Sequence, residues 1–115
     1  MGSRAEVRFM WGETVEAAIY IHWDGYPEGV FALFDRFYKA VEAETTDHRY
    51  NDPSYLAAKF VVFVAREGAS DGPQGNLNFL GVGIVQPGKS DFTWAYEVQT
   101  VLGGTKRPPV TLIER

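Results

Sequence analysis

The stretch IYIHWDGYPEGVFALFDRF, residues 19–37, contains the change of hydrophobic period that decides the fold. Up to residue 23 the apolar side chains alternate with other residues, which predicts a β-strand. From residue 27 they recur every three or four positions, which predicts an amphipathic helix. Asp24 and Gly25 between them are turn formers, and Pro27 suits the first turn of a helix. A strand therefore leads through a tight corner into a helix.

The residues before this stretch predict a partner strand. Residues 5–11 also alternate, and Gly12 and Glu13 after them predict a tight reversal. We expect the two strands to form a hairpin with Tyr20 and His22 on its outer face. The expected core face carries Val7, Phe9, Trp11, Val15, Ala17, Ile19, Ile21 and Trp23.

Two helices are expected in the middle of the chain. The first runs from Pro27 to about Glu44, with an apolar stripe along one side. The second begins at Pro53, with Asp52 as its N-cap. The run FVVFVA at residues 60–65 is compatible with this helix, but its valines also permit a strand, so both interpretations stay open.

The last third of the chain predicts three more strands. Residues 77–85 and 92–101 are expected to pair as a hairpin with a long turn, and residues 110–114 to form a short edge strand after two prolines. Phe92, Trp94, Tyr96 and Val98 share one face of the second strand. Glycines at positions 81 and 83 of the first strand leave room for a ring to lie across its backbone.

The order β-β-α-α-β-β-β predicts an α+β fold with a mainly antiparallel sheet and two helices on one face. A length of 115 residues predicts a single domain over positions 1–115. Hydrophobic residues make up 45% and charged residues 23% of the chain, which is typical of a globular protein and argues against disorder.

Charge and composition exclude several classes of function. A net charge of −4 opposes the clustered cations that nucleic-acid binding requires. The absence of cysteine excludes disulfides, thiolate catalysis and sulfur-ligated zinc. No stretch predicts a signal peptide or a membrane span, so we expect a cytoplasmic protein.

The corner at residues 22–29 is the expected binding site. The N-terminus of a helix attracts anions through its unpaired N–H groups, and aromatic rings flank this one. We therefore expect a homo-oligomeric binding protein that holds a small anionic or nucleotide-like ligand, or a host protein partner, at the corner and an adjoining aromatic face. The alternative is that these residues only form a turn and pack the core. The expected ligand-binding residues are Tyr20, His22, Asp24, Gly25, Tyr26 and Trp94.

Two other roles stay open. One is a metal-dependent hydrolase that uses His22, Asp24 and His48, although two histidines in the whole chain give a sparse ligand set. The other is a structural homo-oligomer in which the apolar second helix covers a subunit interface. No dinucleotide or phosphate-loop motif and no catalytic pair occurs, so we favour a non-catalytic role without cofactor or metal.

The segments YIHWDGYPEG and NDPSYLAAKFVVF resemble a group of small uncharacterised proteins found in phages and bacteria that share a His-Trp-Asp-Gly-Tyr-Pro core. The resemblance covers about residues 20 to 66. It implies an accessory phage or bacterial protein that acts by sequestering or blocking a partner, and it assigns no catalytic residue.

Overall fold

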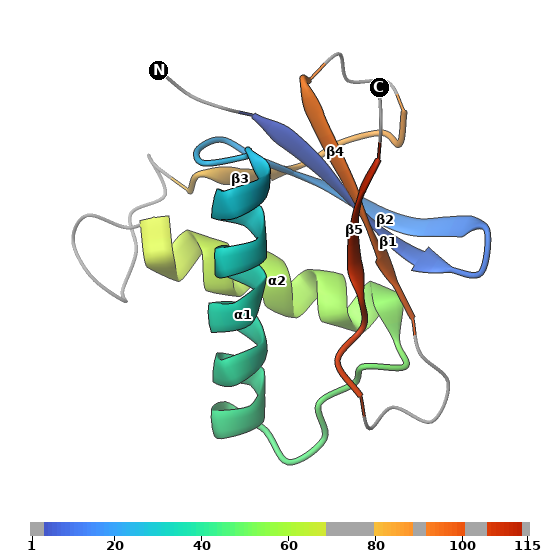
Figure 1. Cartoon of the computed structure of the whole chain (residues 1–115). Coiled ribbons are helices and arrows are strands. Elements are labelled where there is room, and N and C mark those ends of the chain that lie inside the picture. The colour runs from blue at the N-terminus through green and yellow to red at the C-terminus, as the bar shows by residue number, and fades with distance from the viewer. Residues whose placement is uncertain (1–3, 69–79, 89–91, 101–105, 114–115) are drawn as a thin grey trace.

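The computed structural model describes residues 4–68, 80–88, 92–100 and 106–113. Within these residues two helices pack against a five-stranded sheet, which confirms the α+β class, and Figure 1 shows their arrangement. The elements are β1 (Ala5–Trp11), β2 (Thr14–Ile21), α1 (Pro27–Glu44), α2 (Pro53–Gly68), β3 (Val82–Ile84), β4 (Trp94–Gln99) and β5 (Val110–Ile113).

The strands lie in the order β3-β2-β1-β4-β5, with β1 at the centre. The predicted hairpin of β1 and β2 is confirmed, and β5 is the edge strand. The predicted hairpin between residues 77–85 and 92–101 is wrong, because β3 pairs with β2 whereas β4 pairs with β1. The β1–β4 pair is parallel, so the sheet is mixed. Pairing β4 beside β1 places the apolar residues of both strands on the same face, where the core needs them.

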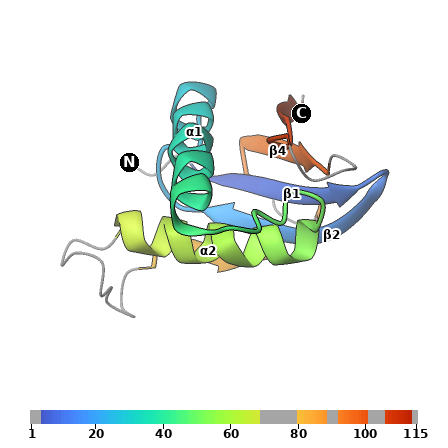
Figure 2. The same ribbon diagram turned by 90° about the horizontal axis from the view of Figure 1, so that it is seen from below.

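Phenylalanine side chains join the helices to the sheet in one core. Phe60 of α2 is fully buried, and its ring stacks on Phe34 of α1 at 4.7 Å between ring centroids. The same ring contacts Phe9 of β1 at 5.5 Å and Phe37 of α1 at 5.3 Å. Residues 60–65 lie within α2, so this segment is a helix and not the strand that its valines also permit. Figure 2 shows α2 running along β1 and β2, with α1 standing across it.

The start of α2 follows the expected capping pattern. The backbone N–H of Tyr55 donates to Asp52 Oδ1 at 3.1 Å, and Pro53 is the first helical residue. None of the helices in the described ranges is both long and apolar enough to cross a membrane.

Two tryptophans expected in the core are exposed. Trp11 is 48% and Trp23 is 45% exposed. A β-bulge between Phe9 and Met10 interrupts the alternation, and Trp11 lies beyond it at the end of the hairpin. Trp23 follows the last residue of β2, where no neighbouring strand imposes alternation.

The sheet face opposite the helices also contains buried groups. The ring of Tyr20 lies so close to Gly83 that a Cβ there would overlap it, and it contacts Phe92 at 5.7 Å. Glu6 is fully buried on this face, where its carboxylate accepts hydrogen bonds from Arg8 Nε at 2.6 Å and from the backbone N–H of Gly88 at 3.1 Å. Residues that follow β3 therefore contact the second face of the sheet.

The single aromatic face expected from Tyr20 and Trp94 does not form. Trp94 pairs with Ala5 and packs against the core on the side that the helices cover. Tyr20 pairs with Glu6 and lies on the other side. Phe92 lies outside β4 and joins Tyr20, so it does not share a face with Trp94.

Arg107 fastens the segment before β5 to α1. Its guanidinium donates to both carboxylate oxygens of Glu42, at 2.7 and 2.8 Å, and it also contacts Asp35 at 3.5 Å. The same group lies over the ring of Tyr38, whose hydroxyl donates to the carbonyl oxygen of Pro108 at 2.6 Å. The edge strand is therefore held by charge-assisted hydrogen bonds as well as by its ladder.

The Arg107–Glu42 contact should make the free energy of unfolding depend on pH in the acidic range. Hydrogen bonds from Arg107 and then from Tyr50 lower the pKa of Glu42 to about 2 from an ordinary 4.5. A lowered pKa stabilises the folded state above pH 4.5, and this stabilisation is lost as the pH falls towards 2. Because the Glu42 side chain is 35% exposed, we expect Glu42→Gln to cost only about 1 kcal/mol at pH 7. Urea unfolding at pH 7 and at pH 2.5 measures this difference.

The control for this experiment is Glu13→Gln, which removes a carboxylate from the exposed hairpin turn. It should leave the free energy of unfolding nearly unchanged at both pH values. If Glu42→Gln costs as much at pH 2.5 as at pH 7, the charge of Glu42 does not stabilise the fold.

Candidate functional site

The corner between β2 and α1 is held by hydrogen bonds to two segments that are distant in sequence, one just before β3 and one in β4. The N–H of His22 donates to the carbonyl oxygen of Gly81 at 3.0 Å. Asp24 adopts a positive φ of 58°, a conformation that aspartate tolerates better than most residues. Gly25 is buried, and its carbonyl oxygen accepts the hydroxyl of Tyr96 at 2.6 Å. The corner is therefore fixed from both sides.

Two glycines allow close approaches at this corner. A Cβ at Gly29 would overlap the carbonyl oxygen of Asp24, so the chain can fold back onto the first turn of α1 only without a side chain there. A Cβ at Gly81 would lie 2.6 Å from Cζ3 of Trp23, and Gly81 has a positive φ of 71°. The indole ring is therefore held directly against the backbone.

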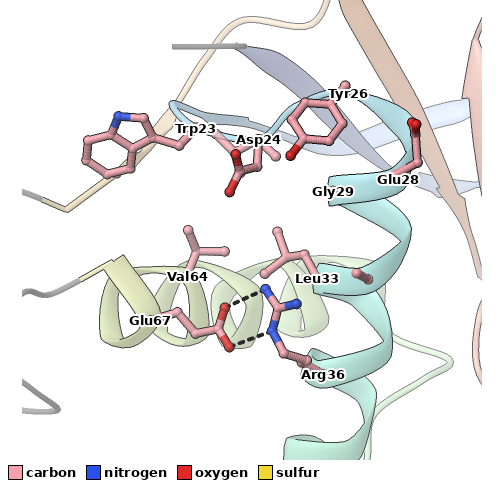
Figure 3. A pocket seen from close by; sticks show the side chains of 12 residues that line it. Trp23, Asp24, Tyr26, Glu28, Gly29, Leu33, Arg36, Val64 and Glu67 are labelled. Atoms are coloured by element: carbon pink, nitrogen blue, oxygen red, sulfur yellow. Dashed lines mark hydrogen bonds and ion pairs between the residues drawn. The ribbon is translucent and has the colours of Figure 1, made fainter. Parts of the chain in front are cut away.

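A pocket of about 400 Å³ opens below the corner, between α1 and the end of α2 (Figure 3). Trp23 stands at one side of it, and the carboxylate of Asp24 and the hydroxyl of Tyr26 point into it. Leu33 and Val64, each 8% exposed, supply apolar atoms below. Aromatic, apolar and polar groups thus meet in one concave site, as small-molecule and side-chain sites require.

An ion pair lies across the lower side of this pocket. Arg36 of α1 donates to both carboxylate oxygens of Glu67 of α2, at 2.8 and 2.9 Å. The hydrogen bond to Glu67 is the largest cause of the raised pKa of Arg36, and the charge of Asp24 adds to it. The guanidinium is thus already matched by one carboxylate, while Asp24 leaves the pocket with a negative excess.

The structure brings some of the expected binding residues together. Asp24 and Tyr26 line the pocket. His22 and Gly25 adjoin it without lining it, because the imidazole of His22 packs edge to face on Trp23 and the carbonyl of Gly25 points towards Tyr96. The corner is thus part of a concave site. Of its four expected binding residues, Asp24 and Tyr26 line the pocket, whereas His22 and Gly25 lie outside the lining and hold the corner in place.

Tyr20 and Trp94 are not part of this pocket. Tyr20 lies on the sheet face away from the helices, and Trp94 packs against the core. Their expected role in binding requires one continuous aromatic face, and the two side chains lie on opposite faces of the sheet.

Sequence reasoning missed Leu33, Arg36, Val64 and Glu67, and it placed Trp23 in the core. The first two follow Gly29 at helical spacing, so they share its side of α1, and this signal was present in the sequence. Glu67 belongs to another helix, and its place beside Arg36 depends on how α1 and α2 cross. No pattern in the sequence contains that information.

His22, Asp24 and His48 cannot form one metal site. His22 and Asp24 precede α1 and His48 follows it, and an α-helix of 18 residues spans about 27 Å. His48 instead contacts Thr45 Oγ1 at 3.1 Å and the ring of Tyr50. Within the described ranges, no group of three His, Cys, Asp or Glu side chains could hold a metal ion. This geometry argues against a metal site built from His22, Asp24 and His48.

Comparisons of the chain with protein-family models, with curated proteins and with solved structures found no match.

The close approach of Gly29 to Asp24 should reverse the usual effect of a helical glycine. Gly29→Ala would normally stabilise a helix by up to about 1 kcal/mol. Here the added Cβ meets a backbone oxygen, so we expect it to destabilise the protein by about 1–3 kcal/mol, measured by urea unfolding. Glu28→Ala, at the exposed neighbouring position, is the control and should change stability little. Equal or higher stability of Gly29→Ala would show that the corner does not require this contact.

Proposed function

We propose that this protein is a non-catalytic binding protein and that the pocket below the corner is its binding site. The observation that carries the proposal is the meeting of Trp23, the Asp24 carboxylate and the apolar side chains of Leu33 and Val64 in one cavity. An exposed indole beside buried aliphatic groups is typical of sites that capture a ligand or a partner's side chain.

The chemistry of the lining supports binding rather than catalysis. The residues that line the pocket in the described part of the chain include no Ser, Thr, Lys or His, so the lining offers no Ser–His or Thr–Lys type of activated nucleophile. Of the three carboxylates in the described lining, Glu67 is engaged by Arg36, which leaves Asp24 and Glu28 without a free cation nearby to bind an anionic substrate.

The charges of the pocket do not favour the anionic or nucleotide-like ligand expected from the sequence. Asp24 points into the pocket, Glu28 lies in the first turn of α1, and both carboxylates oppose an anion at the helix N-terminus. Arg36 is the single cation among the described lining residues, and Glu67 already binds it. The occupant that fits better is neutral or positively charged.

A protein partner would fit this site as well as a small molecule. The likeness of residues 20–66 to small phage and bacterial proteins is compatible with a role in blocking such a partner. Homo-oligomer formation stays a separate prediction. Tyr55 and Val62, which are 50% and 58% exposed on α2, are the apolar residues that such an interface would use.

A variant that fills the pocket tests the proposal. Ala32 is an exposed lining residue of α1, so Ala32→Trp should occupy the cavity without entering the core. Ala43→Trp, at an exposed position of the same helix outside the pocket, is the matched control. Amide NMR spectra of the full chain are recorded with a library of cationic, neutral and anionic fragments.

We expect at least one class of fragment to shift the resonances of Trp23, Gly29 and Leu33 together in the wild type and in Ala43→Trp, and not in Ala32→Trp. If no fragment of any charge shifts these resonances, or if Ala32→Trp binds as the wild type does, the pocket is not a binding site.

A further inference from the structure

The carboxylate of Asp24 lies at the mouth of the pocket and acts on Arg36 only through its charge, without a direct contact. It points into the cavity (Figure 3), and within the described ranges it makes no ion pair or side-chain hydrogen bond. The nearest cation across the pocket is Arg36, whose guanidinium donates two hydrogen bonds to Glu67. A cation that entered beside Asp24 would therefore be attracted without displacing an existing ion pair.

Trp23 supplies an aromatic surface next to this charge. Its indole is 45% exposed, yet contacts with Gly81 and with the imidazole of His22 hold it in place. An immobilised indole is the preferred aromatic partner of an ammonium or guanidinium group, and it loses little conformational entropy when a ligand binds.

The rest of the pocket suits a flexible aliphatic chain. Leu33 and Val64 present apolar atoms between the corner and the Arg36–Glu67 pair. A volume of about 400 Å³ accommodates one long side chain rather than a folded element. Methylene groups would pack on the apolar atoms while the charged end lies between Trp23 and Asp24.

We propose that the pocket binds a guanidinium or ammonium group on an aliphatic stem, as presented by an arginine or lysine side chain of a partner polypeptide. This inference rests on the proposed function, because it names the chemistry of the group that the same pocket takes. The negative net charge of the chain would also attract a basic partner.

Two probes of equal size test the charge of the ligand. Nα-acetyl-arginine methylamide and Nα-acetyl-citrulline methylamide differ only in a guanidinium group against a neutral urea. In NMR titrations of the full chain, the arginine probe should shift the resonances of Trp23, Gly29 and Leu33. The citrulline probe should bind roughly fivefold to tenfold more weakly. Nα-acetyl-glutamate methylamide should not bind.

A variant that removes the charge of Asp24 is the second test of this inference. Asn tolerates a positive φ as Asp does, so Asp24→Asn should keep the corner intact. It should reduce the affinity for the arginine probe to that for the citrulline probe. Glu16→Gln, which removes one charge from an exposed position of β2 outside the pocket, should leave both affinities unchanged.

The outcomes separate this inference from the proposed function. Equal binding of the arginine and citrulline probes, or an unchanged affinity in Asp24→Asn, would overturn the assignment of a cation while the pocket remained a binding site. Binding of butylguanidinium without binding of the capped arginine would overturn a polypeptide source. If neither probe binds, the inference fails, and the fragment library decides separately whether the pocket binds anything.

Discussion

The contact on which the structure depends is the stacking of Phe60 on Phe34 inside the core. Phe60 also touches Phe9 and Phe37, so one ring joins the central strand to both helices. Offset stacking of buried rings adds a directional preference to the burial of apolar area. This contact, together with those of Phe37 with Phe60 and Phe63, therefore contributes to how α1 and α2 cross. The pocket is a consequence of that crossing, because one wall belongs to each helix.

The shape of the site depends on two glycines that have no side chain at points of close approach. Gly29 and Gly81 lack side chains where the carbonyl oxygen of Asp24 and the indole of Trp23 must approach the backbone. Those approaches aim a carboxylate and an aromatic ring at the same cavity, and the hydroxyl of Tyr96 holds the turn between them. A ligand would meet these groups already in position, so little ordering would oppose its binding.

Local features of the fold could be predicted from the sequence, and pairing between distant segments could not. The period change at residues 19–37, the Asp52 cap and the first hairpin are encoded by neighbouring residues, and all are found in the structure. The partner of β4 is not encoded in this way, because alternation shows that a strand has a buried face but not which strand lies beside it. The contact of Glu67 with Arg36 and the β-bulge before Trp11 could not be predicted for the same reason, because both depend on how distant or paired segments are placed.

The central position of β1 has a consequence for how the chain folds. Its second edge pairs with β4, from which it is separated in sequence by β2, both helices and β3. During synthesis β1, β2 and the two helices emerge first, and one full edge of β1 then offers unpaired N–H and C=O groups until β4 is made. Parallel pairing over such a separation is slow to form, because the loop-closure entropy is lost before the contacts are gained. The interval before β4 docks is therefore the period in which this protein is most exposed to aggregation.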